Sequence, residues 1–144
     1  MSREIIEKIR ERFKEKVEIF EKSPKRIYVN VDKKDSPNVI QYLFEDLGAR
    51  FSIASGVDTR AGIEILYHMA FDNENLFVTV RTLAPKPNPE IDSIVLFLPG
   101  AEWIEREIHD LLGVNFIGHP NLERLLLSDD WPEGKYPLRK EEES

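Results

Sequence analysis

The sequence contains no cysteine, and this absence excludes several kinds of site at once. Without a thiol the chain can form no disulfide, no thiolate zinc site and no cysteine nucleophile, and it offers no cysteine ligand to an iron–sulfur cluster. Glycine is scarce too, and the seven residues are scattered, so neither a Walker loop nor a dinucleotide fingerprint occurs. One glutamine and two methionines beside 33% charged residues are typical of thermophilic proteins.

Long apolar runs are also lacking. The longest, Ile94–Leu98, is far shorter than the ~20 residues that span a bilayer, and Met1–Glu4 lack the apolar stretch of a secretion signal. The 144 residues, 41% of them apolar, fit one domain that buries about 68–70% of the surface of its unfolded chain. We therefore expect a soluble intracellular domain whose core needs no disulfide and no structural metal.

Charge is distributed unevenly along the chain, whose formal net charge is −7. Residues 1–34 hold 11 Lys or Arg and 7 Asp or Glu, a net charge of +4, whereas residues 35–144 hold 9 and 20, a net charge of −11. An acidic body repels phosphate backbones, so no nucleic-acid partner is expected. The positive segment either lies against an acidic surface, its own or another protein's, or is a solvated helix of mixed charge.

The N-terminal segment predicts a helix followed by a strand. Five apolar residues fall within an arc of roughly 80° at helical spacing. They are Ile6, Ile9, Phe13, Val17 and Phe20. We expect this first helix to end at Pro24, with a short strand at Arg26–Val31.

A second helix is expected with Ser36 as its N-cap, Pro37 at the first helical position and Gly48 just past its end. Alternating apolar residues then predict three more strands and the turns between them. The strands are expected at 50–55, 63–71 and 76–80, and the turns at 56–62 and 72–75.

The last expected element is a helix that begins at Pro99 and is closed by Gly113. Residues 91–98 before it fit either a short helix or a strand. The order α-β-α-β-β-β-α predicts an α/β fold, an α+β two-layer sandwich with its helices largely on one face of the sheet. We expect residues 1–113 to form one domain and residues 114–144 to form an extended segment that packs on it and on partner proteins.

The helix of residues 101–112 has two distinct faces on a helical wheel. Its core-facing residues are expected to be Ala101, Ile104, Ile108, Leu111 and Leu112. The opposite side is expected to carry Trp103, Arg106, Glu107 and Asp110, flanked by Glu102, Glu105 and His109. Arg106 and Asp110 have the i,i+4 spacing of an ion pair. Tryptophan and arginine are enriched at binding hot spots, so either a partner or the C-terminal segment covers this side.

The chemistry-bearing residues assemble no recognisable catalytic site. None of the three histidines, His68, His109 and His119, forms an i,i+4 pair with another, and Ser128–Asp130 fits a turn or helix cap. One alternative class remains an enzyme that uses Glu105, Glu107, His109 and Asp110 for acid–base work or metal-assisted hydrolysis. Another is a free-standing adaptor that binds an unrelated protein.

The last third of the chain resembles a known family. Residues 99–113, PGAEWIEREIHDLLG, are similar to the signature of the thirty-kilodalton subunit, also called the C subunit, of respiratory complex I. The similarity covers residues 88–140, with the upstream elements agreeing in order and character. It continues through Phe116, Gly118–Pro120, Leu122–Leu127, Asp129–Trp131 and Pro137–Lys140.

This resemblance implies a non-catalytic, cofactor-free subunit of the peripheral arm, on the cytoplasmic face of an ion-translocating membrane complex. Its partners would be the large catalytic subunit and subunits holding iron–sulfur clusters. Relatives occur in membrane-bound [NiFe] hydrogenases, where the large subunit holds the NiFe centre. Trp131–Lys140 lacks the second Gly-His-Pro usual in complex I, and the chain stops at Ser144 without the tail of many members. The string at 131–140 is more similar to the hydrogenase branch. Both departures count against the alternative, the thirty-kilodalton subunit of an NADH:quinone or related donor:quinone oxidoreductase.

The resemblance also implies which residues dock partners or maintain the motif. They are Trp103, Glu105, Arg106, Glu107, Asp110, His119, Pro120, Arg124, Asp130, Trp131, Leu138 and Arg139. Ion pairing among the charged residues of the helix is expected to set the docking register. Arg124 and Arg139 are expected to donate bidentate hydrogen bonds to partner carboxylates or carbonyls. No catalytic, cofactor-binding or metal site is expected in the chain itself.

Overall fold

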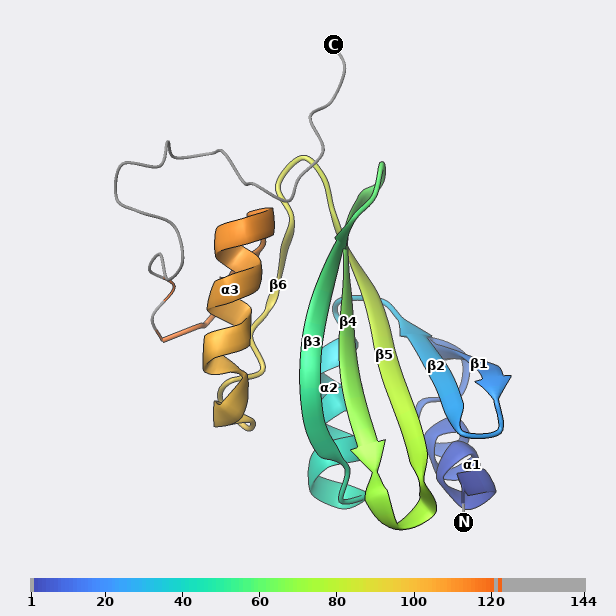
Figure 1. The fold of residues 1–144 in the computed structure, drawn as a ribbon. Helices are drawn as coiled ribbons and strands as arrows, with labels where there is room; N and C mark the ends of the chain where they lie inside the picture. Colours follow the sequence, from blue (N-terminus) through green and yellow to red (C-terminus); the bar gives the residue numbers. More distant parts are fainter. Residues whose placement is uncertain (1, 121, 123–144) are drawn as a thin grey trace. The chain divides into compact units, whose positions relative to one another are not determined.

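A computed structural model describes residues 2–120 and 122 of the chain (Figure 1). They divide into two compact units. Unit 1 comprises the residues up to Ala54 together with Leu66–Thr82, and unit 2 comprises Ser55–Ile65 and the residues from Leu83 onward. Among the described helices, none combines the length and the apolar character needed to cross a membrane.

The elements of unit 1 begin with α1 (Ser2–Phe13) and a 3₁₀ turn (Lys14–Lys16). Strands β1 (Val17–Ser23) and β2 (Arg26–Val31) follow. The chain continues into α2 (Ser36–Gln41), which runs on as a π-helical segment (Tyr42–Asp46). Its other strands are parts of β3 (Arg50–Asp58), β4 (Gly62–Phe71) and β5 (Leu76–Pro85), with a 3₁₀ turn (Asp72–Glu74) between the last two.

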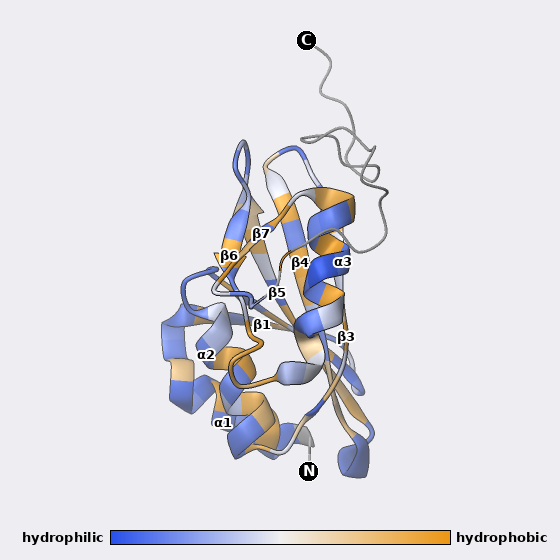
Figure 2. Ribbon diagram, turned by 90° about the vertical axis from the view of Figure 1, so that its left-hand side faces the viewer, coloured by the Kyte–Doolittle hydropathy of each residue, from blue (hydrophilic) through white to orange (hydrophobic). Residues whose placement is uncertain are grey.

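The described strands β1 to β5 form one mixed sheet in the order β1-β2-β5-β4-β3. β1 pairs with β2 antiparallel, and β2 pairs with β5 parallel although about fifty residues separate them. Ile27, Val29 and Val80 are buried on one face of this sheet. In Figure 1, α1 and α2 lie on the same side of the sheet, and Figure 2 shows apolar and polar residues alternating around α1. The predicted α/β class and layering are therefore confirmed for these elements.

The prediction that the first helix continues to Pro24 is wrong. The helix ends at Phe13, Lys14 adopts a left-handed φ of 51°, and residues 17–23 form β1. Residue Val17 pairs with Val31, and Phe20 pairs with Tyr28. The hairpin pairs the inner edge of β1 with β2, and this tertiary pairing outweighs the local helical spacing.

Two finer boundary predictions also differ from the structure. Ser36 is not the N-cap, because Asp35 precedes the helix without a side-chain cap and the Ser36 hydroxyl donates to the Lys33 carbonyl at 3.0 Å. The expected turn at 56–62 is shorter, since β3 runs through Asp58. Continued strand pairing supplies hydrogen bonds to these residues that a long turn would leave unmade.

Unit 2 is built around a helix and a small two-stranded sheet. β6 (Glu90–Asp92) pairs parallel with β7 (Asn115–Ile117), and the chain between them passes through a 3₁₀ turn (Pro99–Ala101) into α3 (Glu102–Leu112). The ambiguous stretch at 91–98 thus starts in a strand and continues as turns. The buried apolar residues of this unit include Ile63, Ile65, Ile91, Ile94, Ala101, Ile108, Leu112, Val114 and Phe116.

Candidate functional site

The helix α3 carries most of the predicted site residues, and both of its ends follow the sequence prediction. Pro99 opens the preceding 3₁₀ turn, and Gly113 closes the helix with a left-handed φ of 75° and a backbone bond to His109 at 2.9 Å. Ile108 and Leu112 are buried as expected, whereas Ile104 and Leu111 are only half-buried. The helix therefore holds a fixed place in unit 2 from which its polar side chains project.

Glu105 is buried and held by two hydrogen bonds. The Ser93 hydroxyl donates to its Oε1 at 2.5 Å, and the Ile94 backbone N–H donates to its Oε2 at 2.9 Å. Ser93 in turn accepts a bond from the Val95 N–H at 3.1 Å, and its own N–H donates to the Ile117 carbonyl at 2.8 Å. The carboxylate thus fastens α3 to the turn after β6, and the Ser93 backbone N–H fastens that turn to β7.

Burial raises the pKa of Glu105, because a charged carboxylate is poorly solvated there. The bonds from Ser93 and Ile94 and the nearby His119 oppose this rise by favouring the ionised form. The three favourable interactions are weaker than the cost of removing the carboxylate from water. Glu105 is therefore a buried acid whose protonation is coupled to the folding of unit 2.

His119 closes the same cluster from the segment after β7. Its side chain is fully buried, its Nε2 donates to the Glu102 carbonyl at 3.0 Å, and the same nitrogen lies 4.0 Å from Glu105 Oε1. The carbonyl can only accept, so Nε2 carries a proton. His109 bonds through Nδ1 to the Val114 carbonyl at 2.8 Å. Glu105 and His119, both predicted site residues, are thus brought together.

Asp110 was predicted to lie on the outer side of α3, and this prediction is wrong. The residue is 2% exposed and Glu105 is 1% exposed. A helical wheel with one buried face fails because Asp110 lies about 160° around the helix from Ile108 and Leu112, and all three residues are buried. Glu105 lies within about 60° of Ile108 and Leu112, so the Ser93 hydrogen bond is on the same side as these two residues.

The outer side of α3 carries a tryptophan–arginine pair. Trp103 is 60% exposed, and the Arg106 guanidinium lies 5.8 Å from the centre of its indole ring. This is a cation–π contact at a surface site. Glu107 is half-buried on the same helix. Trp103 and Arg106 together offer a large flat apolar surface beside fixed N–H donors, which is the chemistry of a protein-binding hot spot.

The remaining predicted residues lie beyond α3. Pro120 is exposed. Five predicted site residues lie outside the described part of the chain. They are Arg124, Asp130, Trp131, Leu138 and Arg139.

Sequence reasoning missed Ser93 and a buried ion pair. Lys86 Nζ lies 2.6 Å from Asp58 Oδ1, with side-chain exposures of 14% and 4%. Both partners flank turns, and no local spacing relates residues 58 and 86. The only sequence indication for Ser93 is that it is a hydroxyl residue at the start of a turn. Its acceptor, Glu105, lies twelve residues downstream, so no local pattern connects the two.

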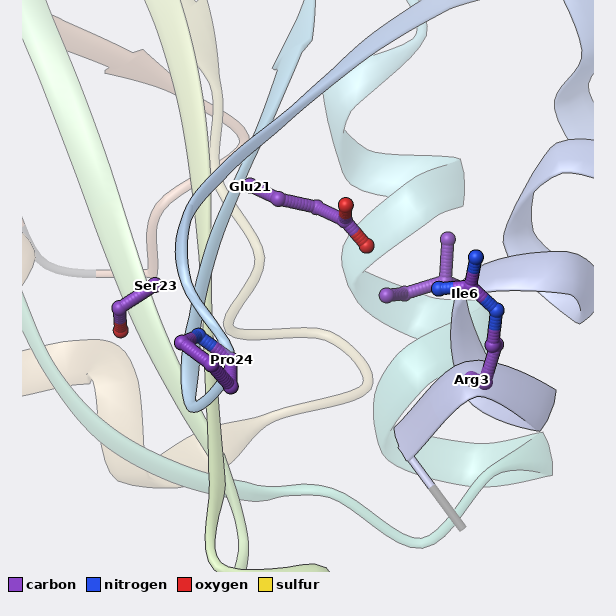
Figure 3. A pocket seen from close by; sticks show the side chains of 5 residues that line it. All are labelled: Arg3, Ile6, Glu21, Ser23 and Pro24. Carbon is purple, nitrogen blue, oxygen red and sulfur yellow. The ribbon is translucent and has the colours of Figure 1, made fainter.

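Among residues 2–120 and 122, no group of three or more His, Asp or Glu side chains is arranged to hold a metal ion. An open pocket of about 360 Å³ lies in unit 1 near the start of α1, as Figure 3 shows. Its charged lining residues are Arg3 and Glu21, of opposite sign, beside Ile6, Ser23 and Pro24. This lining selects no particular ligand.

Residues 29–144 match the family described as the 30-kDa subunit of respiratory-chain NADH dehydrogenase. The C subunit of the F420H2 dehydrogenase of Methanosarcina mazei is 37% identical over 99% of this chain and 92% of its own length. Hydrogenase-4 component G of Escherichia coli is 32% identical over 83% of this chain, which spans only 22% of that larger protein.

A solved structure has the same fold. It is a chain from the structure of the membrane-bound sulfane sulfur reductase, an archaeal respiratory membrane complex. The two chains superpose with a TM-score of 0.85 at 24% identity, over 96% of this chain and 83% of the other.

Proposed function

Since the chain belongs to the family of the 30-kDa subunit of respiratory-chain NADH dehydrogenase, we propose that it is a cofactor-free docking subunit of a complex I-like membrane-bound complex. In this proposal it lies in the peripheral arm, on the cytoplasmic face of the membrane. It binds the large catalytic subunit and the subunits that carry iron–sulfur clusters. Electrons pass through these neighbours, while this chain fixes their geometry and excludes water from the interface.

The observation that carries the proposal is that the two sides of α3 differ, since the inner side is held by hydrogen bonds and the outer side is exposed. On its inner side Glu105 accepts hydrogen bonds from Ser93 and Ile94, which tie the helix to the turn after β6. On its outer side Trp103 is 60% exposed with Arg106 stacked against it. A rigid helix that presents Trp and Arg to solvent is suited to binding another protein.

Within this family we propose a complex of the hydrogenase type or a related one. Hydrogenase-4 component G supports this by its 32% identity over most of the chain. The sequence of residues 131–140, which lacks a second Gly-His-Pro, supports it independently.

A second candidate is the thirty-kilodalton subunit of a donor:quinone oxidoreductase. The similarity to the F420H2 dehydrogenase of Methanosarcina mazei favours it, because that match extends over 92% of the relative's length. In this case the electron donor would be F420H2 or NADH, and the complex would hold no nickel.

The test is affinity purification of the tagged chain from native membranes in mild detergent. Nickel together with hydrogen-dependent reduction of iron–sulfur signals would select the hydrogenase type. Quinone reduction by NADH or F420H2 without nickel would select the second candidate. Recovery of the tagged chain alone, or with companions that hold no cluster, would contradict both and favour a free-standing adaptor.

A further inference from the structure

The sheet of unit 1 has an outer face on which aromatic rings and cationic side chains alternate. We call it the aromatic–cation face. Its residues come from β1, β2 and β5, and they are Phe20, Lys22, Arg26, Tyr28, Phe77 and Arg81. Cross-strand register places them together, because Phe20 pairs with Tyr28 and Arg26 pairs with Phe77. Helices α1 and α2 lie on the other side of the sheet (Figure 1).

Each cation of this face lies over an aromatic ring. The Arg26 guanidinium is 5.4 Å from the centre of the Phe77 ring, and the Arg81 guanidinium is 5.1 Å from the centre of the Tyr28 ring. Lys22 Nζ lies 5.8 Å from the same tyrosine ring. The Phe20 ring packs beside Tyr28 with 6.4 Å between ring centres. Cation–π contacts of this kind hold the cations at fixed places above the sheet.

The charge of this face contrasts with that of the chain. The chain carries a net charge of −7, yet none of Lys22, Arg26 and Arg81 forms an ion pair within the described residues. Arg81 uses its Nε to donate to the Asn30 amide oxygen at 2.7 Å. In β1, β2 and β5, Glu18 is the carboxylate that register places on this face, opposite Asn30. Within β1, β2 and β5, three cations thus share this face with one carboxylate.

The face is also apolar enough to bind a protein. Phe20 is 55% exposed and Phe77 is 42% exposed. Exposed aromatic rings supply contact area with little entropy to lose, and a guanidinium stacked on a ring keeps its N–H edges available for a bidentate carboxylate.

We propose that the aromatic–cation face docks a carboxylate-bearing segment of a partner protein. The identity of that partner as a companion subunit rests on the proposed function, but the docking chemistry does not. A single-stranded nucleic acid would need open ring faces on which to stack its bases. Here cations already cover Tyr28 and Phe77, and the acidic chain repels a polyphosphate. A carboxylate, in contrast, can bind to the N–H groups of these cations without stacking on a ring.

The test uses the complex as it is purified from native membranes. The tagged chain carries the photoreactive residue p-benzoylphenylalanine in place of Phe77, and irradiated products are mapped by mass spectrometry. The expected product joins position 77 to an Asp- or Glu-containing peptide of another protein. The same residue placed at Phe13, which is buried against Tyr42, serves as control and gives links only within the chain.

Variants then test the role of the cations. Arg26→Gln with Arg81→Gln is expected to lower the yield of the intermolecular link at least about tenfold, as for loss of hot-spot contacts. Lys8→Gln with Arg10→Gln removes the same charge from the exposed side of α1 and leaves the yield unchanged. Circular dichroism melting confirms that both double variants fold.

Several outcomes would overturn the proposal. They are a link from position 77 to residues 121–144 of the same chain, a link to a second copy of the chain, no link at all, or a link whose yield is insensitive to the two arginines. Tight binding of a labelled oligouridine that competes with the link would overturn it too. The proposed function is tested separately. If it fails, the proteins that co-purify with the chain hold no iron, but position 77 can still form a link to an acidic peptide.

Discussion

The hydroxyl oxygen of Ser93 lies 2.5 Å from Oε1 of Glu105, and through this bond the turn after β6 holds the buried carboxylate of α3. The second carboxylate oxygen accepts the Ile94 N–H. One side chain therefore ties together segments that are distant in sequence. The outer residues of α3, Trp103 and Arg106, depend on this inner attachment for their position.

Replacement of Glu105 by glutamine should change how stability depends on pH. The pKa of Glu105 is raised above its ordinary value of 4.5, so over the interval from 4.5 up to that raised pKa the folded state retains a proton that the unfolded state has lost. The stabilisation is complete below pH 4.5 and is lost as pH rises through the folded pKa. The wild type should therefore lose stability relative to Glu105→Gln over this interval, in urea unfolding from pH 4 to 8.

Ser93→Ala is the companion variant. It removes a donor that favours the ionised form, so the interval should extend to higher pH. Parallel stability profiles of the wild type and Glu105→Gln would contradict the account of this cluster.

Replacement of Arg106 by alanine should impair assembly more than folding. Arg106 lies over the exposed Trp103 ring, so its loss removes a surface contact while the buried anchor at Glu105 remains. We expect the recovery of companion subunits to fall about tenfold and the melting temperature of the chain to change little. Arg60→Ala, at an exposed turn, is the matched control. Equal loss of chain stability, with recovery intact, would refute the docking role.

Replacement of Lys86 by methionine should destabilise unit 2. The Asp58 side chain is 4% exposed, and this change removes the cation that lies 2.6 Å from its Oδ1. Because Lys86 keeps some exposure, we expect a loss toward the lower end of about 3–5 kcal/mol in denaturant unfolding. Lys86→Arg should retain most of the stability, and adding Asp58→Asn to Lys86→Met should restore part of it. A loss within experimental error would show that the pair is dispensable.

Replacement of Gly62 by alanine should lower the free energy of unfolding, because the added methyl group has no room. A Cβ at this position would clash with the Ala84 carbonyl oxygen and lie 2.8 Å from Pro85 Cα, and these are backbone atoms that cannot move aside cheaply. We expect a loss of about 1–3 kcal/mol or more in unfolding free energy. Gly100→Ala is the control, because its nearest neighbour is a Leu98 methyl carbon at 4.0 Å. Equal stability of the two variants would contradict the geometry.

NMR titration of His68 tests the electrostatics of the sheet in unit 1. Burial, and then the charge of Arg26, lowers the pKa of His68 below 6.5, and its Nδ1 lies 3.1 Å from Thr79 Oγ1. Arg26→Gln should raise this pKa part of the way, since burial remains the larger cause. Arg10→Gln should leave it unchanged. An unperturbed pKa in the wild type would be inconsistent with the packing of β4 against β5.

Local sequence patterns predicted an element correctly where the signals for its two ends and the spacing of its apolar residues indicated the same element. The helix between Pro99 and Gly113 is confirmed because both end signals and the buried Ile108 and Leu112 coincide. At residues 17–23 the local pattern and the structure differ. Val17 and Phe20 continue the helical spacing of the preceding residues, but the left-handed Lys14 ends the helix and pairing with β2 makes this segment a strand. Neither of these is visible in a local window.

The candidate site was predictable on its outer side only. The exposure of Trp103 follows from its place on the helical wheel. The burial of Glu105 and Asp110 does not, because a carboxylate becomes tolerable inside only when donors from elsewhere meet it. For Glu105 those donors are a hydroxyl and a backbone N–H twelve and eleven residues upstream. Such pairing is a property of the tertiary structure.

The most direct test of the central claim is the iron content of the tagged chain in two states. The first is the assembly purified from native membranes, and the second is the chain isolated from it by dissociation. A cofactor-free docking subunit predicts stoichiometric iron in the assembly, retained by the companion chains, and none on the isolated chain. An assembly without iron, or iron that stays with the isolated chain, would contradict the account.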